Sequence, residues 1–367
     1  QLRLRDTSVL GPVDGPWGHG LSYDALADPE LSLSFLDLAT DMAQSASRVR
    51  RIGLEKSNSC LVYDDRLIIK IFRRLHAGRN PEAVLAITLD EVGFNHVATP
   101  ISVWRKDPFD LALVREFLPG GTDGWALALT SLRDLFSRGG APELAGGDFG
   151  AEARRLGEMT SKLHLALAQA FGSDPARGGE WVHGVQESLT RVSADGNARS
   201  AQVVDELGRL GIAGCSIPIH GDYHLGRVMR TEVGWYVLDL EGDPSRPLDE
   251  RHERLSPLKD VAAMLRSFEY ATVAAVRERG PAESAELAEL PAAWERRNRA
   301  AFLDGYLGLT DIYRLVPADT ATFELVLEAF ELEKAARELA FELAYRPWRA
   351  PALRAALDRL LAEQQPS

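Results

Sequence analysis

The feature that most constrains the fold of this 367-residue chain is a change in its hydrophobic pattern near residue 119. Before this point, turn residues separate short apolar runs, which predicts strands and short helices. After it, apolar residues recur at helical spacing over long segments, and one short pair of strands interrupts them. Pro119-Gly120-Gly121 lies at the change and is typical of a linker. The pattern predicts an α+β fold with a strand-containing N-terminal lobe and a helical C-terminal lobe.

The apolar periodicity also predicts the order of the elements in each lobe. The N-terminal lobe is expected to contain a helix at about 30–45, a β-hairpin at 59–72 with its turn at Asp64-Asp65, a helix after Asn80-Pro81, and strands at 100–104 and 111–117. Helices of the C-terminal lobe are expected at 122–137, 149–172, 179–194, 197–210, 257–279, 286–308 and 319–345.

Composition and charge argue against several classes of function. The net charge of −12 argues against a nucleic-acid-binding surface, because such a surface needs a basic face. Cys60 and Cys215 have no metal-ligand spacing, so neither a disulfide scaffold nor a zinc site is expected. So few cysteines are typical of a protein in the reducing cytoplasm, and we expect that location. No apolar run is long enough for a membrane helix, so no membrane partner is expected.

Residues 1–5 include neither an initiator Met nor a signal core, so we expect the chain to begin within a longer gene product. A monomer or weak dimer is expected.

Two aspartates separated by a predicted strand indicate the chemistry. Asp222 lies in the segment 219–227, and Asp239 follows seventeen residues later, after the strand-like 234–238. A polar turn is the simpler interpretation of the first segment, because Gly and Asp are frequent in turns. A second carboxylate at the end of an apolar strand, however, needs a cation, and Mg²⁺ is the natural one. One carboxylate that accepts a hydroxyl proton and one that holds Mg²⁺ on nucleotide phosphates are what phosphoryl transfer requires.

Lys70 is the candidate phosphate-binding cation of the N-terminal lobe. It lies in the alternating run 67–72, where a single lysine is more often a solvated strand residue. In an ATP-binding lobe, its ammonium would instead contact the α- and β-phosphates. The chain has no GxGxxG or Walker A motif, so hydroxyls and backbone amides of Ser57, Asn58 and Ser59 are expected to cap the phosphates.

These residues carry a family resemblance. The segments 57–74, 220–226, 239–244 and 256–268 resemble the maltokinase-like branch of the aminoglycoside-phosphotransferase-type kinases, and the chain is similar to that branch from about residue 20 onward. The resemblance implies a bilobal, eukaryotic-protein-kinase-like fold. It divides the chain into a partial N-terminal cap (1–48), a nucleotide-binding N-lobe (49–118, with a hinge at 115–121), and a helical C-lobe (122–367) with the catalytic loop and the acceptor site.

The resemblance also implies the role of each site residue. Asp222 would be the catalytic base, Asp239 a magnesium ligand and Lys70 the phosphate-binding lysine. Backbone groups of Glu116 and Leu118 would contact adenine. ATP would be the phosphoryl donor, and Mg²⁺ the cofactor.

Two departures from the family pattern affect these roles. Arg227 replaces an amide side chain that would bind metal, and a guanidinium cannot ligate Mg²⁺. Three alternatives follow: a single metal suffices, Glu241 supplies the oxygen, or Arg227 contacts phosphate. The helix after Pro81 has Val84 where a glutamate facing Lys70 is expected, and Glu82 is the nearest substitute.

Asp260 and Arg266 lie on a strongly apolar predicted helix. For such residues we favour a structural role, in which a buried aspartate accepts hydrogen bonds from backbone amides of the catalytic loop.

The acceptor site is expected on the C-terminal helices. Lys334, Arg337, Glu338 and Phe341 share one helical stripe, although a solvated amphipathic face is the commoner meaning of such charges. His224 and Trp348 are further candidates for sugar contacts. Maltokinases resemble this chain at Lys334 and Glu338 but have tyrosines at the positions of Arg337 and Phe341, where they hold a disaccharide.

This difference favours a smaller acceptor. We predict ATP-dependent phosphorylation of glucosamine to glucosamine 6-phosphate, as in the glucosamine kinases related to maltokinases, with the sugar amine against Glu338. The alternatives are phosphorylation of maltose to maltose 1-phosphate, phosphorylation of an aminoglycoside, and a non-catalytic ATP-binding pseudokinase module.

Overall fold

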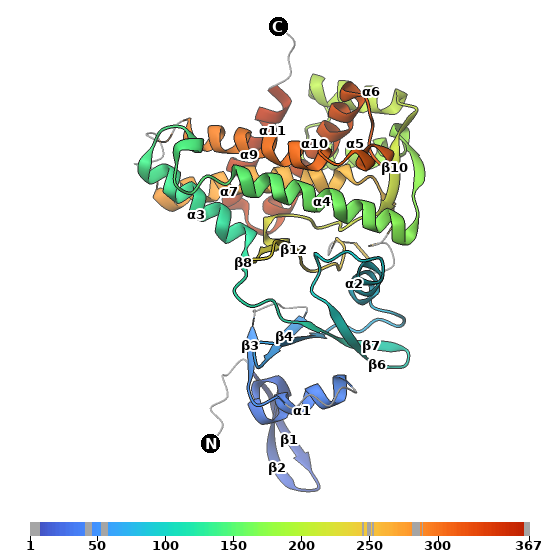
Figure 1. Ribbon diagram of the computed structural model, residues 1–367, viewed down its shortest axis with the longest axis vertical. Helices are drawn as coiled ribbons and strands as arrows, with labels where there is room; N and C mark the ends of the chain where they lie inside the picture. Colours follow the sequence, from blue (N-terminus) through green and yellow to red (C-terminus); the bar gives the residue numbers. More distant parts are fainter. Residues whose placement is uncertain are drawn as a thin grey trace. The chain divides into compact units, whose positions relative to one another are not determined.

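The computed structural model describes residues 8–40, 46–52, 58–243, 246–247, 251, 253–280, 287 and 289–362 (Figure 1). The chain divides into two compact units: Gln1–Glu91 with Val97–Gly121, and Val92–His96 with Thr122–Ser367. Strands dominate the first unit and helices the second, so the predicted α+β class is confirmed. Among the described residues, none of the helices combines the length and apolar character needed to cross a membrane.

The first unit is built on a five-stranded antiparallel sheet in the order β3-β4-β5-β7-β6. Asp64 and Asp65 form the turn between β4 and β5 in the left-handed conformation that a tight hairpin requires (φ 49° and 52°). The predicted hairpin is therefore confirmed. The elements are β1 (Val9–Gly15), β2 (Gly18–Tyr23), η2 (Ala25–Ala27), α1 (Pro29–Ala39), β3 (Val49–Ile52), β4 (Asn58–Tyr63), β5 (Leu67–Phe72), α2 (Pro81–Glu91), β6 (Pro100–Lys106) and β7 (Phe109–Glu116).

Helix α1 completes the core of this unit. Asp28 caps its first turn by accepting hydrogen bonds from two backbone amides, and Pro29 follows at the first helical position. Leu36 of α1 packs with Leu61 and Ile69 of the sheet, all of them buried. Tyr63 Oη donates a hydrogen bond of 2.6 Å to Ser32 O, which ties the sheet to the helix.

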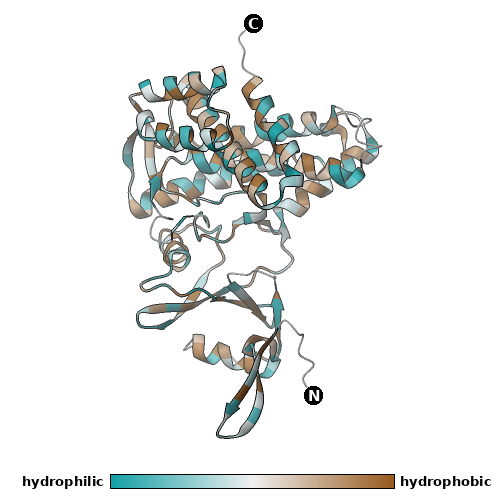
Figure 2. Cartoon of the chain, turned by 180° about the vertical axis from the view of Figure 1, so that it is seen from behind, coloured by the Kyte–Doolittle hydropathy of each residue, from teal (hydrophilic) through white to brown (hydrophobic). Residues whose placement is uncertain are grey.

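The second unit is a helical layer structure in which most helices carry both apolar and polar segments (Figure 2). Helices α4 and α9 lie side by side (Figure 1). Its elements are β8 (Thr122–Asp123), α3 (Gly124–Arg138), η3 (Pro142–Leu144), α4 (Gly150–Phe171), β9 (Asp174–Arg177), η4 (Gly178–Glu180), α5 (Val182–Arg191), α6 (Ala198–Arg209), β10 (Ile212–Pro218), η5 (Leu225–Arg227), β11 (Val228–Arg230), β12 (Trp235–Val237), β13 (Arg254–Leu255), α7 (Leu258–Arg279), α9 (Leu290–Leu307), η7 (Thr310–Arg314), α10 (Thr320–Tyr345), η8 (Pro347–Arg349) and α11 (Ala350–Ala362).

Two glycines explain the close approach of α4 and α9. A Cβ on Gly157 of α4 would overlap the carbonyl oxygen of Phe302, and one on Gly305 of α9 would overlap the carbonyl oxygen of Arg154. Each helix therefore presents a glycine to the backbone of the other. The crossing is closer than any side chain would allow.

The predicted elements agree with the structure over most of their length. The helix expected at 30–45 ends at Ala39, and residues 41–45 lie outside the described part. Strands β9, β10 and β13 and helix α11 were not predicted, because short strands among helices and a helix after Pro347 leave little periodicity. Asn58, expected to help cap the phosphates, is the first residue of strand β4.

Candidate active site

The segment between β10 and β11 carries Asp222, the predicted base, and is named the catalytic loop for that prediction. The buried carboxylate of Asp260 on α7 holds this loop. Asp260 accepts hydrogen bonds from His220 N (2.8 Å) and Gly221 N (2.9 Å). Gly221 has a φ of +79°, and a Cβ there would come within 3.1 Å of Asp243 N. These contacts confirm the structural role that the sequence predicted for Asp260.

A network of buried polar side chains surrounds Asp260. His164 Nε2 lies 3.4 Å from Asp260 Oδ2, and its Nδ1 lies 2.9 Å from Tyr306 Oη. Tyr223, inside the catalytic loop, shares a 2.8 Å hydrogen bond with Thr160. All these side chains are buried, so their hydrogen bonds restrict the loop to one conformation.

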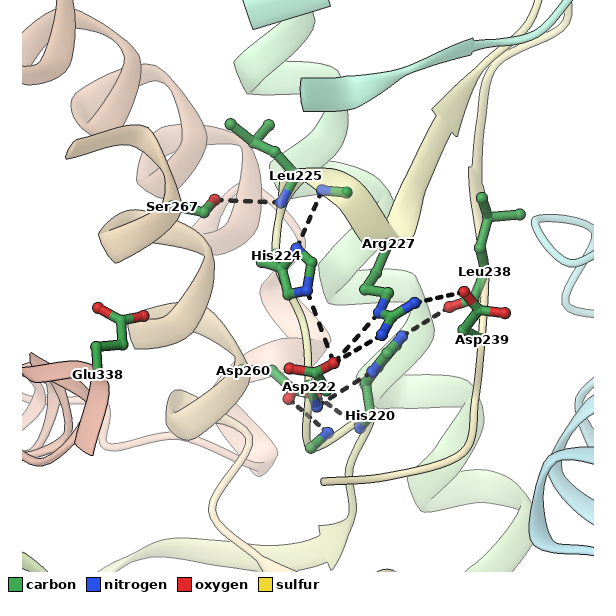
Figure 3. Close-up of polar contacts among 12 residues, drawn as sticks. His220, Asp222, His224, Leu225, Arg227, Leu238, Asp239, Asp260, Ser267 and Glu338 are labelled. Atoms are coloured by element: carbon green, nitrogen blue, oxygen red, sulfur yellow. Dashed lines mark hydrogen bonds and ion pairs between the residues drawn. The ribbon is translucent and has the colours of Figure 1, made fainter. Parts of the chain in front are cut away.

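Arg227 joins the two predicted catalytic aspartates (Figure 3). Its Nε and one terminal nitrogen donate to Asp222 Oδ2 at 3.2 and 3.1 Å, and its other terminal nitrogen donates to Asp239 Oδ2 at 2.6 Å. Asp222 and Asp239 side chains are 19% and 17% exposed, so the pairs are largely shielded from solvent. The fold brings the two aspartates to one cation.

The electrostatic surroundings keep Asp222 ionised. Burial alone would raise its pKa. The imidazole of His224, whose Nε2 lies 3.7 Å from Asp222 Oδ2, and the positive charges of Lys334 and Arg227 outweigh burial and hold the pKa of Asp222 well below its usual range. Asp222 is therefore available as an acceptor at any physiological pH.

Asp239, the predicted magnesium ligand, lies at the end of the segment that pairs with the catalytic loop. It has a φ of +54°, a left-handed conformation rare for residues other than glycine, directly after the segment that pairs Leu238 N with Arg227 O at 2.8 Å. Glu241 follows two residues later and is partly buried. Among the described residues no group of three or more His, Cys, Asp or Glu side chains could hold a metal. Mg²⁺ on a nucleotide needs only one or two carboxylates, because phosphates and water complete its shell. Asp239 and Glu241 fit that requirement.

The catalytic loop opens onto a cavity of about 870 Å³, and the lining residues that the structure describes all belong to the second unit. The predicted base Asp222 lines this cavity, and so do the predicted substrate residues His224, Lys334, Arg337 and Glu338. A cavity of this size holds a monosaccharide with room to spare.

Glu338 has the environment of a ligand-binding carboxylate. Its Oε2 is buried and has no hydrogen-bond partner among the described residues. The nearest cations are Arg266, 3.6 Å from that oxygen, and Lys334, 3.7 Å from Oε1. Figure 3 shows it on a helix apart from the loop that carries Asp222. By contrast, Arg337 forms an ion pair with Asp243.

Aromatic side chains line the cavity too, but Trp348 does not. Trp125 and Tyr270 pack at a centroid distance of 5.8 Å, and Phe341 and Tyr345 at 4.8 Å, and all four are in the lining. Trp348 is 66% exposed in η8 and lies outside it. Its predicted stacking role is therefore not supported. Trp125 and Tyr270 were not predicted as site residues, because an aromatic side chain on a predicted helix more often belongs to the core.

In the first unit, Lys70 is fully buried and its Nζ lies 2.9 Å from Glu82 Oε2. Glu82 also lies 3.4 Å from Arg115 Nη1. The glutamate that pairs with Lys70 is thus Glu82, the substitute that the sequence analysis identified, and not a residue at the position of Val84.

The other predicted nucleotide-binding residues that the structure describes lie at separate places in the first unit, on β4 and at the end of β7. Ser59 Oγ accepts hydrogen bonds from Arg51 (3.2 Å) and Arg73 (2.9 Å), and Asn58 is buried beside it on β4. Ser57 lies outside the described residues. Glu116 ends β7 and accepts a hydrogen bond from Thr99 Oγ1 at 3.2 Å, and Leu118 follows the strand. Their roles stay predictions.

Comparisons with known proteins agree with this picture. No protein-family model matches the chain. It is 28% identical over 358 residues to a glucosamine kinase of Streptacidiphilus jiangxiensis, covering 92% of this chain and 78% of the relative. It is 26% identical over 348 residues to a glucosamine kinase of Mycolicibacterium smegmatis (strain ATCC 700084 / mc(2)155), covering 88% and 82%.

Solved structures establish the fold. A glucosamine kinase in complex with glucosamine, ADP and inorganic phosphate has a TM-score of 0.71 at 24% identity, covering 95% of this chain and 87% of that one. The GDP and kanamycin complex of APH(2")-IIia has a TM-score of 0.51 at 12% identity, covering 91% and 100%. The chain has the fold of the aminoglycoside-phosphotransferase-type kinases.

Proposed function

We propose that this chain, a sugar-kinase homologue of the aminoglycoside phosphotransferase superfamily, transfers the γ-phosphoryl group of ATP to glucosamine and forms glucosamine 6-phosphate. The observation that carries the proposal is a cavity that presents an ionised aspartate, Asp222, together with the carboxylate of Glu338. Sequence similarity to two curated glucosamine kinases over most of the chain supports it.

Glu338 would recognise the sugar amine. An ammonium is the natural partner of a partly buried carboxylate whose Oε2 has no hydrogen-bond partner, and such charge-assisted hydrogen bonds are among the strongest in proteins. Arg266 and Lys334 lie near Glu338 but beyond hydrogen-bond distance, so they balance its charge without occupying its oxygens. A neutral sugar would make a weaker contact at this position.

Asp222 would orient the acceptor hydroxyl and receive its proton. A carboxylate with a pKa well below its usual range is a weak base. In a loose, metaphosphate-like transition state this suffices, because the hydroxyl loses its proton late and positioning dominates catalysis. His224 and Arg227 hold the carboxylate in place for that task.

We assign Lys70 and the segment Ser57–Ser59 to the phosphates of ATP, and the backbone of Glu116 and Leu118 to adenine. Asp239, with Glu241, would hold Mg²⁺, which when bound neutralises phosphate charge. The use of ATP fits the predicted cytoplasmic location, and the monomeric or weakly dimeric state stays a prediction.

A panel of coupled ATP-consumption assays tests the proposal. Glucosamine, glucose, maltose and kanamycin are each offered with ATP and Mg²⁺, and nuclear magnetic resonance of the product locates the phosphate. We expect the highest kcat/KM for glucosamine and phosphorylation at O6. Preference for maltose with phosphate at O1 would favour a maltokinase. ATP binding without turnover of any sugar would favour the pseudokinase alternative.

A further inference from the structure

Arg227 occupies a place that a cation must fill. Asp222 and Asp239 each turn Oδ2 toward the same guanidinium, and both side chains are more than four-fifths buried. Two shielded carboxylates that approach one another repel strongly unless a positive charge lies between them. In this chain the positive charge belongs to the protein itself (Figure 3).

Arg227 makes more contacts than an arginine in an ordinary surface ion pair. Three of its nitrogen atoms are within 3.2 Å of the two aspartates. Its backbone is fixed as well, because Arg227 N donates to His224 O and Arg227 O accepts from Leu238 N, both at 2.8 Å. The guanidinium is thus tied by main chain and side chain to the loop of Asp222 and to the strand end of Asp239.

We propose that Arg227 limits the catalytic centre to one divalent cation by taking the place of a second one between Asp222 and Asp239. The inference rests on the proposed function, in which Asp239 holds the Mg²⁺ of the nucleotide. Arg227 has only donors and cannot ligate a metal, and its fixed charge neutralises the Asp222 side of the pair. Arg227 is therefore a positioning residue that acts through Asp222 and Asp239.

Counting bound metal tests the proposal without reference to turnover. Mn²⁺ replaces Mg²⁺ as a paramagnetic probe, and electron paramagnetic resonance counts the ions bound per chain with the non-hydrolysable analogue β,γ-imido-ATP. We expect one ion in the wild-type protein and in Arg227→Lys, which keeps the charge and cannot ligate. We expect two ions in Arg227→Gln, because the variant loses the guanidinium and gains an amide oxygen. Arg227→Asn supplies the same amide should the Gln variant not fold.

Arg230→Gln is the matched control. Arg230 lies three residues further on and pairs with Glu152 at 2.7 Å, with a side chain 24% exposed against 28% for Arg227. This variant removes a guanidinium of similar burial that pairs with Glu152 and not with Asp222 or Asp239, so its count should stay at one. Two ions in the wild-type protein, or one in the amide variants, would overturn the proposal. Failure of the wild-type protein to bind nucleotide with metal would overturn the proposed function as well. Nucleotide binding with an unexpected count refutes this inference alone.

Discussion

At the residue scale, Asp222 is where the proposed chemistry is most sensitive. Replacing it by Asn keeps the volume and removes the proton acceptor, so kcat for glucosamine should fall by about 10²- to 10⁴-fold. Nucleotide affinity should be unchanged, because Asp222 faces the acceptor cavity. Steady-state assays and isothermal titration with ADP measure the two quantities.

The control is Asp205→Asn, which alters an exposed pair with Arg209. Substantial residual turnover in Asp222→Asn would remove this residue from its proposed role.

The lowered pKa of Asp222 makes a prediction about pH. Because the folded-state pKa lies below the ordinary value near 4, the ionised form stabilises the fold at all pH values above that range. This contribution is lost only as pH falls through the lowered pKa. We therefore expect kcat/KM to show no ionisation of Asp222 between about pH 5 and 8. An acid limb in that window that moves in Asp222→Glu would contradict the assignment.

Glu338→Gln tests the recognition of the amine. The substitution removes the charge and keeps the shape, so a hydrogen bond to a charged group, about 1.5–3 kcal/mol, should be lost with glucosamine only. This corresponds to a fall of about 10- to 150-fold in kcat/KM for glucosamine, with little change for glucose. The control is Glu331→Gln on the same helix, where the carboxylate pairs with Arg299 outside the cavity. Equal losses for both sugars would exclude the contact.

At the element scale, the crossing of α4 and α9 depends on its glycines. Gly157→Ala would force a methyl group against the backbone of Phe302 and should lower the free energy of unfolding by about 1–3 kcal/mol or more. Chemical denaturation measures this change in the free energy of unfolding.

Gly208→Ala on α6 is the control, because its Cβ would meet only Val182 Cγ2 at 3.5 Å. There the usual helix preference for alanine should leave stability unchanged or raise it by up to about 1 kcal/mol. Similar losses at both positions would contradict the crossing argument.

The start of a helix also explains why the sequence placed the expected partner of Lys70 at Val84 and offered Glu82 only as a substitute. Periodicity locates α2 but not its first residue, and the partner of Lys70 depends on that register. Asn80 Oδ1 accepts a hydrogen bond from Glu82 N at 3.0 Å, which fixes the start of α2 and places Glu82 in its first turn. Trp348 shows the same limit, because the helical stripe ends at Tyr345 and the chain turns into η8.

At the scale of the whole molecule, the sequence predicted the α+β class, the long helices and the residues around Asp222, because periodicity and motif spacing are local. The bridge from Arg227 to Asp239 could not be derived in this way. It depends on the left-handed backbone at Asp239, which no glycine marks, and on the pairing of β11 with β12. Contacts between segments distant along the chain are set by tertiary packing, and a single sequence does not record them.

The restriction of the acceptor cavity to one unit predicts a localised response to the sugar. Hydrogen exchange with saturating glucosamine and no nucleotide should slow at the catalytic loop and at the cavity-facing parts of α7 and α10, because binding stabilises only the conformations that contact the ligand. Exchange in the five-stranded sheet of the first unit should be unchanged. Protection of similar size in strands β4 and β5 would contradict this assignment of the sugar site.

The same restriction has an evolutionary consequence. Among the described residues, those that line the cavity belong to the second unit, whereas Lys70 and Glu82 belong to the first. Substitutions on α7 and α10 can therefore exchange one acceptor for another while the lysine–glutamate pair is inherited unchanged. A lineage of such kinases is therefore expected to diversify its acceptors by substitutions on these two helices, under continued selection on the proposed phosphate-binding lysine and its glutamate.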